Sequence, residues 1–207
     1  MQRLDYSKQN QWEKLDSNQS PINLEQTIAK KYSWSKQPLK INFGDSLLEK
    51  ELKDTGDQFF LDGTLQLGKK HYLFERMHFH DGSEHFLETK QFDCELHFVA
   101  KAKNDSLLVL AILGNVVSQN NISNNLERVL DTQISAKIFN QILPKKLSYF
   151  EYKGSLTTPP LLSNVTWIVL TQPIAISQNF LDMLHSDFPN NHRELQPVNN
   201  REINYYS

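Results

Sequence analysis

The segment RMHFHDGSEHF, residues 76–86, places three histidines close to a glutamate and an arginine. Alternate side chains of an extended strand point to the same face, so His78 and His80 are expected to lie side by side. The same alternation puts Glu95 and His97 on one face of the segment CELHFV. Strands that are neighbours in sequence usually pair, which predicts that the three imidazoles meet on one patch of a sheet.

Three neutral imidazoles in this arrangement are typical of a catalytic zinc site. Zinc with three nitrogen ligands keeps its fourth tetrahedral position for water, whose pKa falls to about 7. A structural zinc site usually has four protein ligands with cysteine among them, and the only cysteine here is Cys94. The spacing alone leaves an alternative open, because His-x-His on a strand is a weak motif that ordinary histidines also form.

The elements that must position these residues are predicted to be mainly strands. The clearest candidates are rich in aromatic or β-branched residues and bounded by Gly, Asn, Asp or Ser. They cover residues 71–80, 95–102, 106–114 and 164–170.

Helical periodicity is limited to a segment near 124–131, where Asn124 and Glu127 resemble a capping box, and a shorter one near 178–185. Irregular loops between strands favour a largely antiparallel sheet over a parallel one with intervening helices. We therefore expect a mainly β (α+β) fold, with one large, twisted, mostly antiparallel central sheet and a few short peripheral helices.

Strand alternation also predicts which residues form the core. Leu73, Met77 and Phe79 are expected to face away from the histidines and into the protein. In the segment that follows, Cys94 faces away from Glu95 and His97, so we expect a buried thiol there.

Composition excludes several classes of protein. The 207 residues contain 22 Lys plus Arg and 24 Asp plus Glu, and a net charge of −2 gives no electrostatic footprint for nucleic acid. The apolar runs are shorter than the roughly 20 residues of a membrane helix, and the start shows no secretory signal. Without repeats or linkers, residues 1–207 are expected to form one domain. The missing signal and the lone cysteine together favour a cytoplasmic protein.

Several motifs, taken in order, resemble the α-class carbonic anhydrases. The segments are NQSPINL, HFHDGSEH, ELHFVAK and YKGSLTTPPLLSNVTWIVL, and the tail NHRELQPVNNREI extends the likeness over roughly residues 12–203. The resemblance implies zinc-dependent, reversible hydration of carbon dioxide to bicarbonate and a proton, by attack of zinc-bound hydroxide. The implied partner is this small-molecule substrate, with no nucleic acid or membrane involved.

The resemblance also assigns roles to individual residues. The zinc ligands it implies are His78, His80 and His97. Thr157 is expected to accept a hydrogen bond from zinc-bound hydroxide and to donate its own proton to Glu84, which leaves the hydroxyl only acceptor capacity toward the metal. The substrate side is expected to comprise Thr158 and an apolar wall of Val99, Val109, Leu156, Val165 and Trp167.

The residues around the predicted ligands depart from the family pattern. Glu95 is suited to accept the free ring N–H of His97, but Arg76 stands where the family generally has a glutamine that serves His78. A guanidinium cannot accept a hydrogen bond, and it either points toward the metal or turns outward to a carboxylate such as Glu75. Asp57 occupies the position of the family's proton-shuttle histidine, and an exposed aspartate is too acidic to carry protons efficiently at pH 7.

Two alternatives stay open at this point. The first is a catalytically weak or inactive carbonic-anhydrase-related binding module, which Arg76 and Asp57 support. The second is a zinc hydroxide esterase, because the same nucleophile can attack an activated carbonyl.

Overall fold

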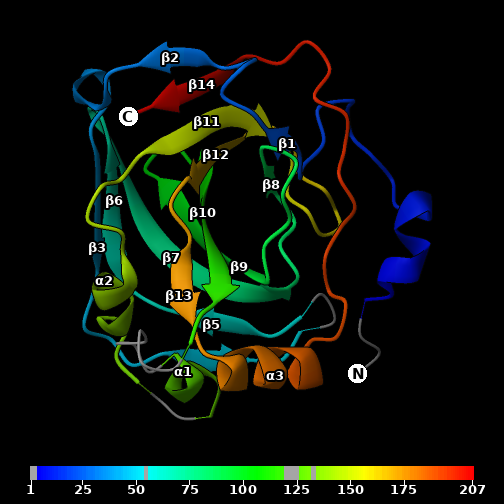
Figure 1. The fold of residues 1–207 in the computed structure, drawn as a ribbon, viewed down its shortest axis with the longest axis vertical. Coiled ribbons are helices and arrows are strands. Elements are labelled where there is room, and N and C mark those ends of the chain that lie inside the picture. Colours follow the sequence, from blue (N-terminus) through cyan, green and yellow to red (C-terminus); the bar gives the residue numbers. More distant parts are fainter. Residues whose placement is uncertain (1–3, 54–55, 119–125, 132–133) are drawn as a thin grey trace.

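The computed structural model describes residues 4–53, 56–118, 126–131 and 134–207, and a 12-stranded sheet dominates it (Figure 1). The strands are β1 (Asn23–Leu24), β2 (Lys30–Tyr32), β3 (Leu39–Phe43), β4 (Glu49–Glu51), β5 (Gln58–Phe60), β6 (Gly63–Leu67), β7 (Lys70–Asp81), β8 (Phe86–Leu87), β9 (Cys94–Ala102), β10 (Leu107–Val116), β11 (Tyr149–Gly154), β12 (Val165–Leu170), β13 (Ile174–Ile176) and β14 (Ile203–Tyr206). The α-helices are α1 (Glu127–Asp131), α2 (Ile138–Ile142) and α3 (Gln178–Asp187), and the 3-10 helices are η1 (Tyr6–Gln11) and η2 (Trp34–Lys36).

The sheet is mixed but mostly antiparallel. Its main path runs β2-β14-β11-β12-β10-β9-β7-β5-β4, with β13 paired to β10 and the hairpin of β3 and β6 joined to β7. The parallel contacts in this sheet are those of β10 with β12 and β13, and of β14 with β2. The predicted fold class and the four predicted strands are confirmed, with β7, β9, β10 and β12 extending or trimming the expected ranges by a few residues.

The pairing of β7 with β9 fixes the position of the histidines. The strands run antiparallel, His78 lies directly opposite His97, and His80 lies opposite Glu95. Directly opposite residues of an antiparallel pair have Cβ atoms roughly 4.5–5.5 Å apart. The register therefore brings the predicted ligands together, as the alternation of β7 and β9 predicts.

A β-bulge in β7 makes the prediction for Leu73 wrong. The register slips between Phe74 and Arg76, which pair with the consecutive residues Ala100 and Val99 of β9. An extra residue in one strand reverses the alternation of faces beyond it. Tyr72 and Phe74 are consequently buried before the bulge, and Leu73 is 63% exposed.

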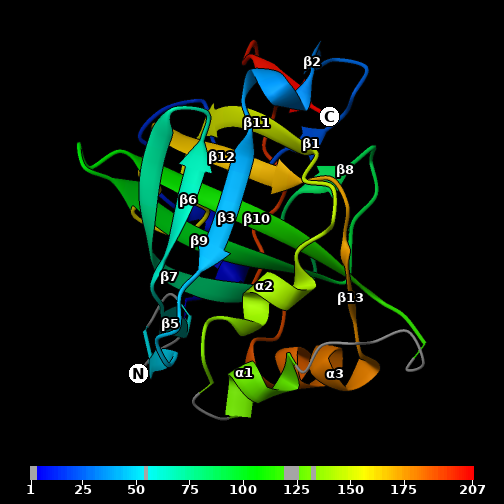
Figure 2. The same ribbon diagram turned by 90° about the vertical axis from the view of Figure 1, so that its left-hand side faces the viewer.

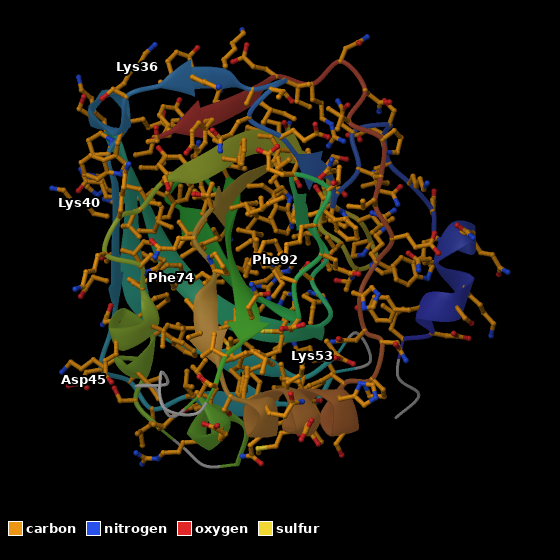
Figure 3. The ribbon with its side chains drawn as sticks, viewed as in Figure 1. Lys36, Lys40, Asp45, Lys53, Phe74 and Phe92 are labelled. Carbon is orange, nitrogen blue, oxygen red and sulfur yellow. The ribbon has the colours of Figure 1, made fainter. Side chains whose placement is uncertain are left out.

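Two apolar clusters cover the two faces of β9 and β10. The first contains Cys94 and Phe98, and the second contains Val99 and Trp167 on the face that carries His97. Figure 3 shows Phe74, from the first cluster, and Phe92, from the second, in the interior. Cys94 is fully buried, as predicted, and burial raises the pKa of its thiol.

The helices lie at the periphery, with α1 and α3 side by side at one end of the sheet (Figures 1 and 2). The expected helix near 178–185 is α3, whose N-cap Ser177 accepts the backbone N–H of Phe180 at 2.9 Å. The helix expected near 124–131 begins at Glu127, and Asn124 of the predicted capping box lies outside the described residues. Within the described ranges, no helix has both the length and the apolar character that crossing a bilayer requires.

Candidate metal centre

Three imidazoles from β7 and β9 converge on one point. The Nδ1 atom of His97 lies 3.1 Å from Nε2 of His80 and 3.3 Å from Nε2 of His78. All three nitrogen atoms lie within 4.8 Å of one another. Four ligands at a Zn–N distance of 2.0–2.1 Å have nitrogen atoms about 3.3 Å apart in a tetrahedron, so the observed separations suit a zinc ion.

Hydrogen bonds on the far side of two rings fix where their lone pairs point. The Nδ1–H group of His80 donates to the carbonyl of Asn191 at 2.6 Å, and the Nε2–H group of His97 donates to Oε1 of Glu95 at 2.8 Å. Each ring thereby turns an unprotonated nitrogen toward the other. Two lone pairs that face each other at 3.1 Å repel unless a cation lies between them, which is the arrangement of a metal site.

Burial keeps the two β7 rings neutral. Desolvation lowers the pKa of His78 well below its usual value, and the charges of His80, His97 and Arg76 lower it further. Desolvation also lowers the pKa of His80, although the carboxylate of Glu84 opposes this shift. Neutral imidazole is the form that binds a metal, so both side chains are ready ligands near pH 7.

Glu95 holds His97 in place, as predicted from the sequence. Its Oε2 atom accepts the backbone N–H groups of Glu84 and His85, at 2.8 and 2.7 Å. Its Oε1 atom accepts from His97 and from Nδ1–H of His85, and the other ring nitrogen of His85 lies 2.7 Å from the Tyr152 hydroxyl. Burial alone raises the pKa of a carboxyl, but His85 and His97 hold the pKa of Glu95 well below its usual value.

His78 has no comparable support. Its Nδ1 atom is buried and has no hydrogen-bond partner among the described residues. Arg76 combines the two orientations considered for it, because its side chain lines the cavity beside His78 while its Nη1 atom donates to Glu75 at 3.4 Å. The arginine therefore supplies positive charge next to the site and no acceptor for the ring.

The predicted hydrogen bond from Thr157 to Glu84 is not formed in the structure. Oε1 of Glu84 accepts the backbone N–H of Arg193 at 2.7 Å, and Oε2 is buried without a hydrogen-bond partner in the described part of the chain. That free oxygen lies 3.4 Å from Nε2 of His80 and 3.8 Å from Nδ1 of His97. The carboxylate thus faces the ligand nitrogens themselves, while Thr157 lines the cavity with His78 and His97.

The apolar wall predicted from the sequence lies largely around this cavity, whose volume is about 30 Å³. Two loop contacts position the threonines, because Trp167 Nε1 donates to the Ser155 carbonyl at 2.9 Å and Leu156 N–H donates to the Leu162 carbonyl at 2.8 Å. The predicted residues that line the cavity are Val99, Val109, Leu156, Thr157, Thr158 and Trp167. Val165 is not on the cavity surface and belongs to the second apolar cluster.

Asp57 differs from the expectation of an exposed aspartate. Its side chain is only 6% exposed, and it forms an ion pair with Lys50 at 2.9 Å. The residue that lines the cavity from this segment is its neighbour Gln58. Asp57 therefore lies off the surface of the cavity, with its carboxylate turned to Lys50.

Sequence reasoning missed residues of the C-terminal segment. The side chain of Asn191 bonds the backbone of β7 on both sides of His80, at Phe79 O and Asp81 N, and so holds its own carbonyl against the ring. Arg193 is buried, and it bonds the Ser20 carbonyl at 2.7 Å while its backbone N–H holds Glu84. The only sequence signal for these residues was the tail motif. That motif does not predict which residues, more than 100 positions earlier in the chain, Asn191 and Arg193 contact.

Comparisons with known proteins show which family the chain resembles. The family model described as eukaryotic-type carbonic anhydrase matches residues 7–207. A carbonic anhydrase of Neisseria gonorrhoeae is 31% identical over 199 residues, which cover 90% of this chain and 76% of the relative. A carbonic anhydrase of a Nostoc species is 32% identical over 205 residues, covering 91% and 76%.

Solved structures give the same result for the fold. The α-carbonic anhydrase of Photobacterium profundum superposes with a TM-score of 0.79 at 28% identity, covering 93% of this chain and 90% of that one. The α-carbonic anhydrase of Thermovibrio ammonificans, solved with the inhibitor sulfanilamide, gives a TM-score of 0.80 at 28% identity, covering 94% and 88%. With its family match, its relatives and its fold in agreement, the chain belongs to the α-carbonic anhydrase family, whose general reaction is the hydration of carbon dioxide.

Proposed function

We propose that the protein is a zinc-dependent carbonic anhydrase that interconverts carbon dioxide and bicarbonate, with His78, His80 and His97 holding the metal. The observation that carries the proposal is the convergence of three ring nitrogens, with the lone pairs of His80 and His97 turned toward each other by the hydrogen bonds on the far side of their rings. Zinc, when bound, supplies a Lewis acid that makes water a nucleophile near neutral pH. Residues 1–207 form a single α-carbonic-anhydrase domain in this proposal.

The side chains of this protein have separate tasks in the proposal. Glu95 and the Asn191 carbonyl orient two of the ligand rings and fix their tautomers. Thr157 lies on the cavity wall with His78 and His97, where its hydroxyl is placed to accept a hydrogen bond from the nucleophile. Val99, Val109, Leu156 and Trp167 give carbon dioxide an apolar surface beside the ligands, and Thr158 lines the side where bicarbonate forms.

The test of this function is stopped-flow carbon dioxide hydration by protein of verified zinc content. We expect hydration well above the uncatalysed rate, lost on removal of zinc with a chelator and restored by adding zinc back. If folded, zinc-loaded protein shows no activity, the protein is instead a catalytically inactive binding module.

Thr157→Val is expected to lower kcat/KM for carbon dioxide by about 10–100-fold, because it removes the hydroxyl that orients the nucleophile. The three histidine ligands stay in place. Zinc content should stay at one ion per chain. The matched control is Thr64→Val, which makes the same change at an exposed position on β6. A Thr157→Val enzyme as active as the control would refute the assignment.

Proton export is expected to limit turnover. The position of the shuttle histidine holds Asp57, which is buried and paired with Lys50. Added imidazole buffer should raise kcat several-fold at constant pH and ionic strength, because the buffer then carries the proton away. Since the proton leaves after bicarbonate has formed, kcat/KM should not change. Stopped-flow measurements over a range of imidazole concentrations check this, and a kcat independent of buffer would contradict it.

The cytoplasm is the compartment we propose for the protein. The support is the single cysteine, which is buried and has no second cysteine with which to form an intramolecular disulfide. Cell fractionation with an antibody against the chain tests this assignment.

A further inference from the structure

A second cavity lies on the opposite face of the sheet from the histidines. Its volume is about 620 Å³, and three chain segments enclose it: the start of β7, the turn between β9 and β10, and the facing residues of β11 and β12. Tyr72 at its base belongs to the first apolar cluster, whereas the cavity with His78 and His97 adjoins the second. The two cavities therefore share no lining residue.

The lining of this groove is positively charged. Lys70, Lys103 and Lys153 contribute to it together with His71, and no lining residue is acidic. This contrasts with the net charge of −2 for the whole chain. The groove thus gathers basic side chains in one place, on a protein that has slightly more acidic than basic residues.

The nearby carboxylates are already engaged with other groups. Asp105, in the turn between β9 and β10, pairs with Lys101 at 2.7 Å. Glu151, which faces Lys153 from the same strand, accepts a hydrogen bond from Gln37 at 2.7 Å and only partly offsets the charge of Lys153. Neither carboxylate lines the groove.

Lys153 is held in a fixed direction in this groove. Its ammonium group donates to Oγ1 of Thr166 at 2.8 Å and to the Asn164 carbonyl at 3.3 Å. Partial burial lowers the pKa of Lys153, and the positive charge of Lys70 lowers it further. Positive groups that repel one another across a groove are stabilised by an anion bound between them.

We propose that this groove binds a small polyanion that carries a phosphate group or several carboxylates. The volume lies in the range of roughly 300–1,000 Å³ that is usual for small-molecule sites. Lysines from the start of β7, the turn after β9 and strand β11 can reach several oxygen atoms of one ligand, and Thr166 and Lys153 provide a fixed polar contact on its inner side.

Isothermal titration calorimetry with pyrophosphate and with citrate tests the proposal and separates the two kinds of anion. Both titrations use zinc-loaded protein and the His97→Ala variant, so that an anion bound at the metal centre is recognised by its loss in the variant. We expect saturable binding of at least one probe in both proteins, weakening as salt is added.

The double variant Lys70→Gln/Lys153→Gln should weaken that binding by at least about tenfold, because two of the converging charges are gone. The matched control, Lys31→Gln/Lys40→Gln, makes the same charge change at exposed positions on β2 and β3, and Figure 3 shows Lys40 at the periphery of the molecule. Carbon dioxide hydration should be the same in all of these proteins except His97→Ala. The proposal fails if neither probe binds at millimolar concentration, or if the control pair weakens binding as much as the groove pair.

Discussion

His97→Ala is expected to remove both the bound zinc and all measurable carbon dioxide hydration. Nδ1 of His97 lies between the other two ligand nitrogens, at 3.1 Å from His80 and 3.3 Å from His78, so its loss leaves two nitrogens and an open side. Losing an outer hydrogen-bond partner of a ligand already costs about 10–100-fold in metal affinity, and losing a ligand must cost more. The expected zinc content after dialysis is far below one ion per chain.

The fold should survive this change, because Glu95 keeps its bonds to the Glu84 and His85 backbone and to the His85 ring. Metal analysis, stopped-flow assays and thermal unfolding, run side by side, check the prediction. His71→Ala is the matched control, since this exposed histidine is not among the three converging rings and should keep both zinc and activity. A His97→Ala protein that still binds zinc stoichiometrically would show that the metal centre has been misplaced.

The fold class and the strands β7, β9, β10 and β12 could be predicted from local patterns in the sequence. The alternation of β9 is uninterrupted, so it predicted both the histidine face and the burial of Cys94. The same reasoning failed at Leu73, because a bulge at the position of Glu75 depends on how β7 pairs with β9 and leaves no mark in the composition of the strand. Local periodicity determines faces only where the register is regular.

The candidate site was predictable to the extent that it comes from two adjacent strands. His78 and His97 meet because β7 and β9, with only the short β8 between them in sequence, pair directly in the main sheet. Asn191 and Arg193 reach the same site from a C-terminal segment without regular secondary structure, and no periodicity specifies where such a segment packs. Asp57 was also placed wrongly, because its ion pair with Lys50 comes from the pairing of β4 with β5, which local patterns did not predict.

The arginine at position 76 should make the protein a weaker zinc binder than its glutamine variant. Nδ1 of His78 is buried without an acceptor, and the adjacent guanidinium disfavours added positive charge in the site, as its lowering of the His78 pKa shows. Arg76→Gln removes that charge and introduces an amide oxygen on the same face of β7, two residues from the ring. We expect zinc affinity to rise by about 10–100-fold, with slower loss of zinc to a chelator.

Arg76→Met separates the two causes, because methionine also removes the charge but offers only a weak acceptor. If the missing acceptor dominates, competition with a chromophoric chelator should show a clear gain in affinity for Arg76→Gln and a small one for Arg76→Met. Equal gains in both variants would assign the effect to charge, and no gain in either would mean that His78 is already well held. Because the readout is zinc affinity, it stays valid whatever the variants do to turnover. A gain in either variant would mean that Arg76 lowers the affinity of the site for zinc while it places a positive charge beside the cavity.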